Sequence, residues 1–127
     1  MTREALERLL CEAEVASPEE ACGLLLGHDG RIEQVVRARN VHPDPQGHFE
    51  IDPQALVDAY RAARGGGPEV LGYYHSHPTG SAEPSAADCE ASAGDERVWA
   101  IVGTGEVRLW RDGDEGFVAL STRVVSG

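Results

Sequence analysis

The sequence has little of what marks secreted, membrane-spanning or cysteine-rich metal-binding proteins. It holds only three cysteines, none in a Cys-x-x-Cys motif, so neither a disulfide framework nor a cysteine-type structural zinc site is indicated. No stretch approaches the ~18 consecutive apolar residues of a membrane span. The acidic N-terminal stretch lacks the apolar core of a signal peptide. We therefore expect a cytoplasmic location with reduced thiols and no membrane partner.

Positive charge is also scarce. Eleven Lys and Arg residues stand against 22 Asp and Glu residues, which gives a formal net charge of −11 at pH 7. Nucleic acids and anionic membranes both attract positive surfaces, so neither is an expected partner. The chain has 127 residues, a usual size for one domain, and no linker or low-complexity tract divides it. We expect a single domain over residues 1–127.

Hydrophobic periodicity and turn residues predict three helices and six strands. The first helix places Leu6, Leu9, Leu10 and Ala13 on one stripe, and Cys11 is expected on that apolar side. The second helix begins after Asp52, because Asp is a good N-cap and a proline follows it at the first helical position. The predicted helices are 3–15, 53–64 and 85–93, and the predicted strands are 21–27, 32–40, 69–75, 97–103, 106–111 and 116–125. This order predicts an α+β fold with three helices packed on a mostly mixed β-sheet.

Chemistry-bearing residues gather in one segment, GYYHSHPTGSAEPSAAD, which spans residues 72–88. His75 and His77 lie two positions apart on an extended stretch, so both rings leave the same face of the strand. Two imidazoles directed at one point form half of a zinc site, and a catalytic site needs a third protein ligand and leaves one position open. Asp88 can supply that ligand if the loop 78–84 folds back. Ser85 precedes it by one helical turn, so both side chains can reach the same space.

A structural interpretation of the same residues is also open. Ser85-x-x-Asp88 matches a capping box at a helix start. A lone His-x-His pair is more often a packed or exposed pair than a metal site. The two interpretations are compatible, since a carboxylate in the first helical turn is favoured by the helix dipole and suits an anionic ligand.

The full pattern, His-x-His-x7-Ser-x2-Asp, resembles the signature of the JAMM (MPN+) zinc metallopeptidases. That family also carries a Glu-x-Cys-Gly sequence far upstream, and EEACGLLLG places Glu20, Cys22 and Gly23 in that register. Looser matches are Asn40 and the FEID sequence before the second helix. The resemblance runs from about residue 3 to 111 and implies a single MPN domain, also described as JAB or cytidine-deaminase-like.

The resemblance implies a role for each matching residue. His75, His77 and Asp88 would bind one Zn2+ per chain, with water as the fourth ligand. Glu20 would take a proton from that water and pass it to the leaving amine. Ser85 would donate a hydrogen bond to the oxyanion.

Compact prokaryotic relatives are associated with ubiquitin-like and sulfur-carrier proteins of the β-grasp fold. The resemblance therefore implies hydrolysis of amide or isopeptide-type bonds at the C-terminal Gly-Gly tail of such carriers. The β-rich run 69–75 is the best candidate for a central strand. We expect the tail to lie along a strand edge beside it, by β-augmentation. Two alternatives stay open: a non-catalytic MPN scaffold, and a JAMM peptidase of other peptides. The oligomeric state does not follow from the sequence.

Overall fold

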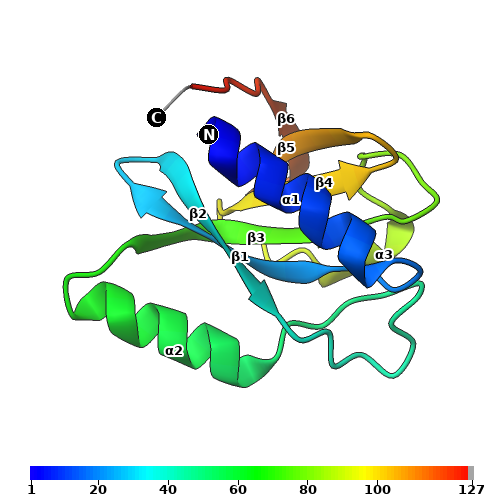
Figure 1. The fold of residues 1–127 in the computed structure, drawn as a ribbon, viewed down its shortest axis with the longest axis horizontal. Coiled ribbons are helices and arrows are strands. Elements are labelled where there is room, and N and C mark those ends of the chain that lie inside the picture. Colours follow the sequence, from blue (N-terminus) through cyan, green and yellow to red (C-terminus); the bar gives the residue numbers. More distant parts are fainter. Residues whose placement is uncertain (126–127) are drawn as a thin grey trace.

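The computed structural model describes residues 1–125, and within them one six-stranded sheet carries three helices (Figure 1). The predicted α+β class is confirmed. The helices are α1 (Arg3–Ala16), α2 (Pro53–Arg64) and α3 (Ala86–Ala91). The strands are β1 (Cys22–His28), β2 (Arg31–Ala38), β3 (Glu69–Ser76), β4 (Val98–Gly103), β5 (Glu106–Gly113) and β6 (Gly116–Leu120). None of the described helices is long and apolar enough to cross a membrane.

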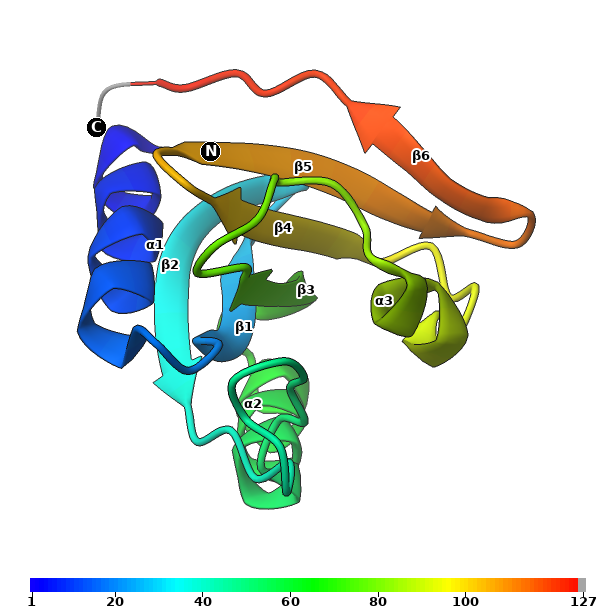
Figure 2. The ribbon, with the colours of Figure 1, turned by 90° about the vertical axis from the view of Figure 1, so that its right-hand side faces the viewer.

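The sheet has the strand order β2-β1-β3-β4-β5-β6. Every neighbouring pair is antiparallel except β3 and β4, which are parallel. A parallel pair needs a crossover connection, because the chain must return to the starting end of the sheet. Here that connection contains α3, which lies beside the end of β3 (Figure 2). The topology therefore brings residues after β3 and residues of α3 to the same place.

The main core lies between α1 and one face of the sheet (Figure 2). Leu9 of α1 and Tyr74 of β3 are both fully buried there. Successive strand residues point to opposite faces, so Tyr73 and His75 project from the other face. On that face the hydroxyl of Tyr73 lies 2.7 Å from the hydroxyl of Tyr60 in α2. The same alternation directs His75 toward α3.

The second helix shows how local sequence fixes an element. The Asp52 side chain accepts a hydrogen bond from the backbone N–H of Gln54, and Pro53 occupies the first turn. Gly65 ends the helix, with its N–H bonded to carbonyls of the last turn. The predicted bounds 53–64 are confirmed.

Three predicted details are wrong. The last strand ends at Leu120 instead of residue 125, because its partner β5 pairs only as far as that residue. The third helix covers only Ala86–Ala91, with Ser85 as its N-cap. Cys11 is exposed, since the buried side of α1 is formed by Ala5, Leu9 and Glu12.

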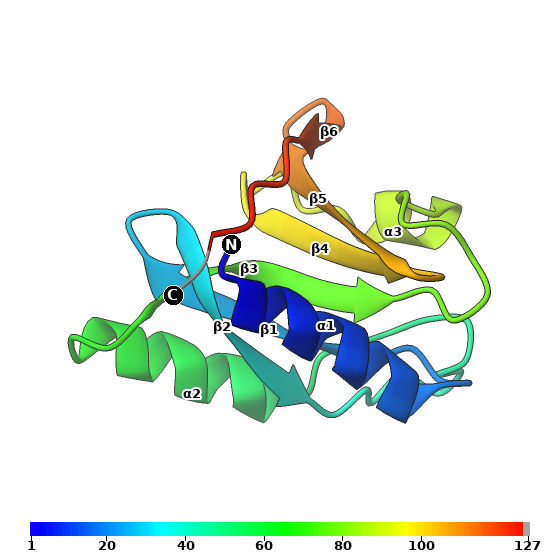
Figure 3. The ribbon, with the colours of Figure 1, turned by 45° about the horizontal axis from the view of Figure 1, so that its top comes forward.

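The central place predicted for the strand 69–75 is confirmed, and for that reason the predicted pairing of a substrate tail beside it is wrong. β3 is a central strand, paired with β1 on one side and β4 on the other (Figure 3). Its backbone groups are already used in the sheet, so no further strand can add to it.

Candidate metal centre

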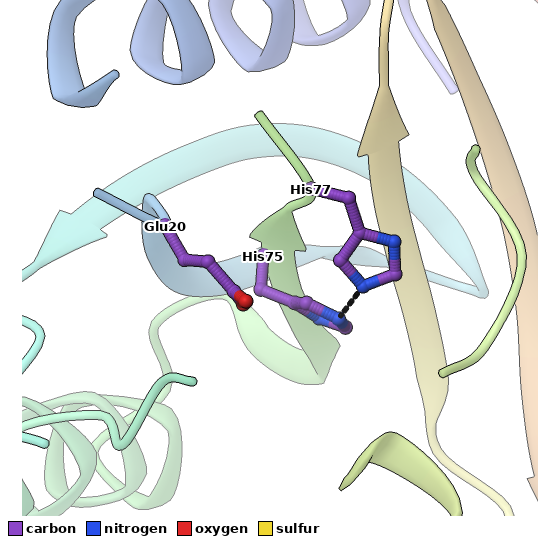
Figure 4. A group of neighbouring side chains, drawn as sticks. All are labelled: Glu20, His75 and His77. Atoms are coloured by element: carbon purple, nitrogen blue, oxygen red, sulfur yellow. Dashed lines mark hydrogen bonds between the residues drawn. The ribbon is translucent and has the colours of Figure 1, made fainter. Parts of the chain in front are cut away.

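The two histidines lie at the C-terminal end of β3. His75 is within the strand, and His77 follows the strand's last residue, Ser76. Their Nε2 atoms are 3.2 Å apart, so both rings reach the same point, as the His-x-His spacing predicts (Figure 4). Ser76 points to the opposite face, where its hydroxyl accepts a hydrogen bond from the Ala21 N–H.

Asp88 of α3 joins the two rings. One carboxylate oxygen lies 3.0 Å from Nε2 of His75, and the other lies 3.1 Å from Nε2 of His77. The same carboxylate accepts a hydrogen bond from the Ser85 N–H, while the Ser85 hydroxyl accepts one from the Asp88 N–H. The capping box and the convergence on the histidines therefore coexist in one side chain, as the sequence allowed.

The spacing of these donor atoms fits a tetrahedral zinc ion. Zinc binds histidine nitrogen and carboxylate oxygen at about 2.0–2.2 Å, so two ligand atoms of a tetrahedron lie roughly 3.3–3.5 Å apart. The distances of 3.0–3.2 Å among His75, His77 and Asp88 are close to that edge length. Without a metal these contacts are hydrogen bonds of ordinary length, and a cation placed among them would take over the same donor atoms. The imidazole and carboxylate chemistry of the set also suits zinc.

Hydrogen bonding fixes one of the two rings. His77 donates from Nδ1 to the Ser81 carbonyl at 2.8 Å, which orients the ring so that Nε2 points into the site. His75 is almost completely buried, and burial lowers its pKa below the ordinary histidine value. A buried neutral imidazole is the form that binds metals.

Asp88 stays ionised in this environment. Burial raises the pKa of its carboxyl, but hydrogen bonds from His75 and His77 lower it by more, so the pKa lies below its ordinary value. The carboxylate is 3% exposed, which makes it a buried anion facing two imidazoles. Hydrogen bonds from the two rings and from the Ser85 N–H stabilise this buried charge, and a metal cation would compensate it more fully.

Glu20 lies beside the two histidines, immediately before β1 (Figure 4). One of its carboxylate oxygens and one nitrogen each of His75 and His77 all lie within 4.8 Å of one another. Burial raises the pKa of Glu20 to about 7, and the nearby histidine His77 opposes that rise. The Glu20/His75/His77 group is consistent with a zinc-binding site, and a carboxylate with this pKa can accept a proton near neutral pH.

The neighbouring residues Glu19 and Glu20 differ in their exposure to solvent. Glu19 is exposed, whereas Glu20 is 7% exposed. The backbone of Glu20 is fixed at both ends: its N–H donates to the Pro45 carbonyl, and its carbonyl accepts from the Asn40 side chain. Cys22, two residues further on, is buried, and burial raises the pKa of its thiol to about 12, which excludes it as a nucleophile at neutral pH.

Ser85 lies at the rim of this site and is exposed. Its oxygen accepts the capping hydrogen bond from Asp88, and a hydroxyl that accepts still has its own hydrogen to donate. Thus the structure brings His75, His77, Asp88 and Glu20 together, with Ser85 next to them.

Sequence reasoning missed two aromatic side chains in this site, Phe49 and Trp99, which contact the ring of His75. Trp99 pairs with Tyr73 across the parallel strands, so its place beside the site follows from the β3–β4 register. Phe49 comes from the loop between β2 and α2. The only local signal was an aromatic residue in a loop otherwise rich in polar residues and proline.

Two hollows open on either side of Glu20. One, of about 280 Å3, lies between the 42–49 loop and α3, and its lining includes His48, Phe49 and Asp88. The other, of about 380 Å3, lies between Gln46 and the 77–85 segment, and its lining includes His77 and Ser85. Glu20 and Gly47 line both hollows, so the two meet at the candidate metal centre.

Comparison with known proteins agrees with this geometry. A family model described as prokaryotic homologs of the JAB domain matches residues 2–113. A probable TtuB-protein conjugate cleaving protease of Thermus thermophilus is 38% identical over 111 residues, covering 87% of this chain and 70% of that protein. A desampylase of Haloferax volcanii is 36% identical over 87 residues, covering 66% of this chain and 62% of that protein, so less than two thirds of its length is spanned. The solution structure of a Desulfitobacterium hafniense protein matches with a TM-score of 0.84 at 30% identity, covering 99% of this chain and 90% of that one.

Proposed function

Because the chain belongs to the prokaryotic JAB-domain family, which confirms its resemblance to the compact JAMM/MPN group, we propose that it is a zinc-dependent metallopeptidase. Its proposed reaction is hydrolysis of amide or isopeptide bonds at the C-terminal Gly-Gly tail of ubiquitin-like or sulfur-carrier proteins. The observation that carries the proposal is the convergence of His75, His77 and Asp88 within 3.2 Å, with the buried carboxylate of Glu20 beside them.

Each residue of the site has a proposed task. His75, His77 and Asp88 hold the zinc ion, which when bound lowers the pKa of water and polarises the substrate carbonyl. Glu20 accepts a proton as water attacks and delivers it to the departing amine, a role suited to its pKa of about 7. Ser85 donates its hydroxyl hydrogen to the developing oxyanion.

The shape of the site supports a substrate in extended form. The two hollows meet at Glu20, so a chain that runs from one to the other places its scissile bond at the metal centre. A flexible C-terminal tail can enter such a trough while the folded β-grasp body of the carrier stays outside. The named activities of the Thermus and Haloferax relatives, which cleave conjugates, support this class of partner.

Two broader features belong to the same proposal. Residues 1–127 act as one domain, built around the six-stranded sheet. The reaction takes place in the cytoplasm, where Cys11, Cys22 and Cys89 stay reduced, in line with the free thiols of the structure.

A paired metal and cleavage assay tests the proposal. The purified protein should contain about one zinc ion per chain and release the leaving group from a Gly-Gly carrier fusion, with loss of activity in a chelator and recovery on adding zinc. Glu20→Gln should keep the metal and lose most turnover, because an amide cannot accept the proton. Ser85→Gly, which costs the helix start only a few tenths of a kcal/mol, should lower kcat on the order of 100-fold.

Full activity in the absence of metal would refute the zinc mechanism. Zinc binding without cleavage of any carrier fusion would instead favour the alternatives, a scaffold or a peptidase of other peptides. These would then be separated by assaying unrelated peptides.

A further inference from the structure

The two histidines of the candidate metal centre are held by different means. His77 is fixed by the hydrogen bond from its Nδ1 to the Ser81 carbonyl. The Nδ1 of His75 is buried and has no hydrogen-bond partner among the described residues. A metal-binding histidine usually donates its second N–H to an acceptor that orients the ring. For His75 something else must set the orientation.

Two aromatic rings occupy the space around His75. Phe49 stacks on its face, with ring centroids 4.2 Å apart and planes inclined by 14°. Trp99 meets it edge-on, with centroids 5.5 Å apart and planes at 90°. Phe49 and Trp99 also contact each other edge-on at 5.9 Å. The imidazole therefore lies in a right-angled aromatic clamp, and rotation of the ring would break one contact or the other.

One ring of the clamp belongs to the sheet and the other belongs to a loop. Trp99 belongs to β4 and is 6% exposed, so the sheet fixes it. Phe49 is half-buried in a loop, and Asn40 fixes the backbone on both sides of it. The Asn40 amide donates to the His48 carbonyl at 2.9 Å and accepts from the Glu50 N–H at 3.1 Å. One side chain thus fastens the loop at the residues that flank the stacking ring.

We propose that Phe49 and Trp99 are positioning residues that hold His75 in its metal-binding orientation, in place of the missing hydrogen bond. Asn40 supports Phe49 through the loop, in addition to its hydrogen bond to the Glu20 carbonyl. This inference rests on the proposed zinc site and assigns the clamp a role in zinc affinity.

Substitution of Phe49 tests the clamp, because Phe49 lies in a loop outside the main core. Phe49→Leu removes the stacked ring, and we expect zinc affinity, measured by competition with a chelating dye, to fall on the order of 10-fold. Phe49→Tyr keeps the ring and should restore the affinity. Phe117→Leu is the matched control: Phe117 is also half-buried and packs against Trp99, with centroids 4.8 Å apart, without contacting His75. The zinc affinity of Phe117→Leu should stay within about twofold of the wild-type affinity, because Phe117 can affect His75 only indirectly, through Trp99.

Two further measurements separate positioning from loss of stability. The absorption spectrum of the Co2+-loaded protein reports ligand geometry, and it should change in Phe49→Leu while matching wild type in Phe49→Tyr and Phe117→Leu. In a double-mutant cycle, Asn40→Ala should weaken zinc binding less in Phe49→Leu than in the wild-type background, because the part transmitted through Phe49 is already lost and only the part through the Glu20 carbonyl is left. An equal effect of Asn40→Ala in both backgrounds would show that Asn40 does not support the clamp. Urea unfolding of the metal-free variants gives their unfolding free energies. Zinc affinities that fall in proportion to these free energies would assign the effect to stability instead of to positioning.

The outcomes are distinct for the two proposals. If the wild-type protein binds no zinc, both the proposed function and the clamp fail. If wild type binds zinc and Phe49→Leu binds it equally tightly with an unchanged Co2+ spectrum, the clamp alone is refuted. Equal losses in Phe49→Leu and Phe117→Leu would also refute it, because the effect would then come from general packing.

Discussion

At Glu20, burial and neighbouring charges act on a single carboxylate. Desolvation raises its pKa to about 7, while His77 favours the ionised form and Asp88 disfavours it. A structural carboxylate would be expected to form an ion pair that lowers its pKa. The raised value instead means that the fold keeps this group in an unfavourable environment, as proteins do where a group must exchange protons.

A stability measurement on metal-free protein tests this directly. The pKa of Glu20 rises from 4.5 to about 7 on folding, so its contribution to stability is fully present below about pH 4.5 and is lost as the pH rises through about 7. Glu20→Gln cannot titrate. Its unfolding free energy relative to wild type should therefore increase between about pH 5 and pH 8, by on the order of 2 kcal/mol. The difference between the two proteins removes titrations that are the same in both, and it reports Glu20 together with its coupling to His77 and Asp88.

Urea unfolding in the presence of a chelator, at several pH values, provides the comparison. Ser85→Gly serves as a control, since it changes no titratable group and its difference from wild type should not vary with pH. If the difference in unfolding free energy between Glu20→Gln and wild type does not vary with pH, the pKa of Glu20 is not raised in the folded protein.

At the scale of single elements, prediction succeeded where the signal was local. Asp52 and Pro53 mark the start of α2, and the helix begins there. The Ser85–Asp88 spacing predicted both a cap and a shared site, and the structure contains both contacts. The β-rich run 69–75 predicted a central strand, and β3 has that place in the sheet. Prediction failed where pairing between segments decides the outcome, because the end of β6 at Leu120 does not follow from its own residues. The position of Trp99 beside His75 was missed for the same reason, because it depends on the register of β3 and β4.

The parallel pair β3–β4 depends on a glycine. A Cβ built on Gly72 would lie 1.7 Å from the Val98 carbonyl oxygen, in the register where these two residues face each other. Gly72→Ala must therefore separate the strands, and we expect a loss of about 3 kcal/mol in unfolding free energy. Because His75 follows on the same strand, zinc affinity should fall as well.

A second glycine supplies the comparison for that substitution. At Gly65, a Cβ would be no closer than 3.5 Å to any neighbour, and its φ is −83°. Gly65→Ala should change stability by less than about 0.5 kcal/mol. Equal stability of the two variants in denaturant unfolding would contradict the close strand approach at Gly72.

For the molecule as a whole, the site joins segments that are far apart in the sequence. Glu20 precedes β1, His75 and His77 end β3, Asp88 belongs to α3, and Phe49 comes from the β2–α2 loop. The resemblance to the family motif named four of these five residues as site candidates, and the structure brings those four side chains together. Phe49 was not predicted, because its role depends on stacking against the ring of His75, and the two residues come together only in the folded chain.

A site assembled from distant segments exists only in the folded chain, so zinc should stabilise the fold. A ligand that binds only the folded state at about 100 times its Kd adds roughly 2.7 kcal/mol. For a chain of this length that corresponds to a rise of about 10 °C in Tm. We expect this rise when zinc is added to chelator-treated protein, measured by thermal unfolding followed by circular dichroism. His77→Ala should abolish it, whereas His28→Ala, which removes an exposed imidazole at the end of β1, should leave it intact. Because both variants lose one histidine, a rise of equal size in His77→Ala would mean that zinc stabilises the protein from some other place than the end of β3.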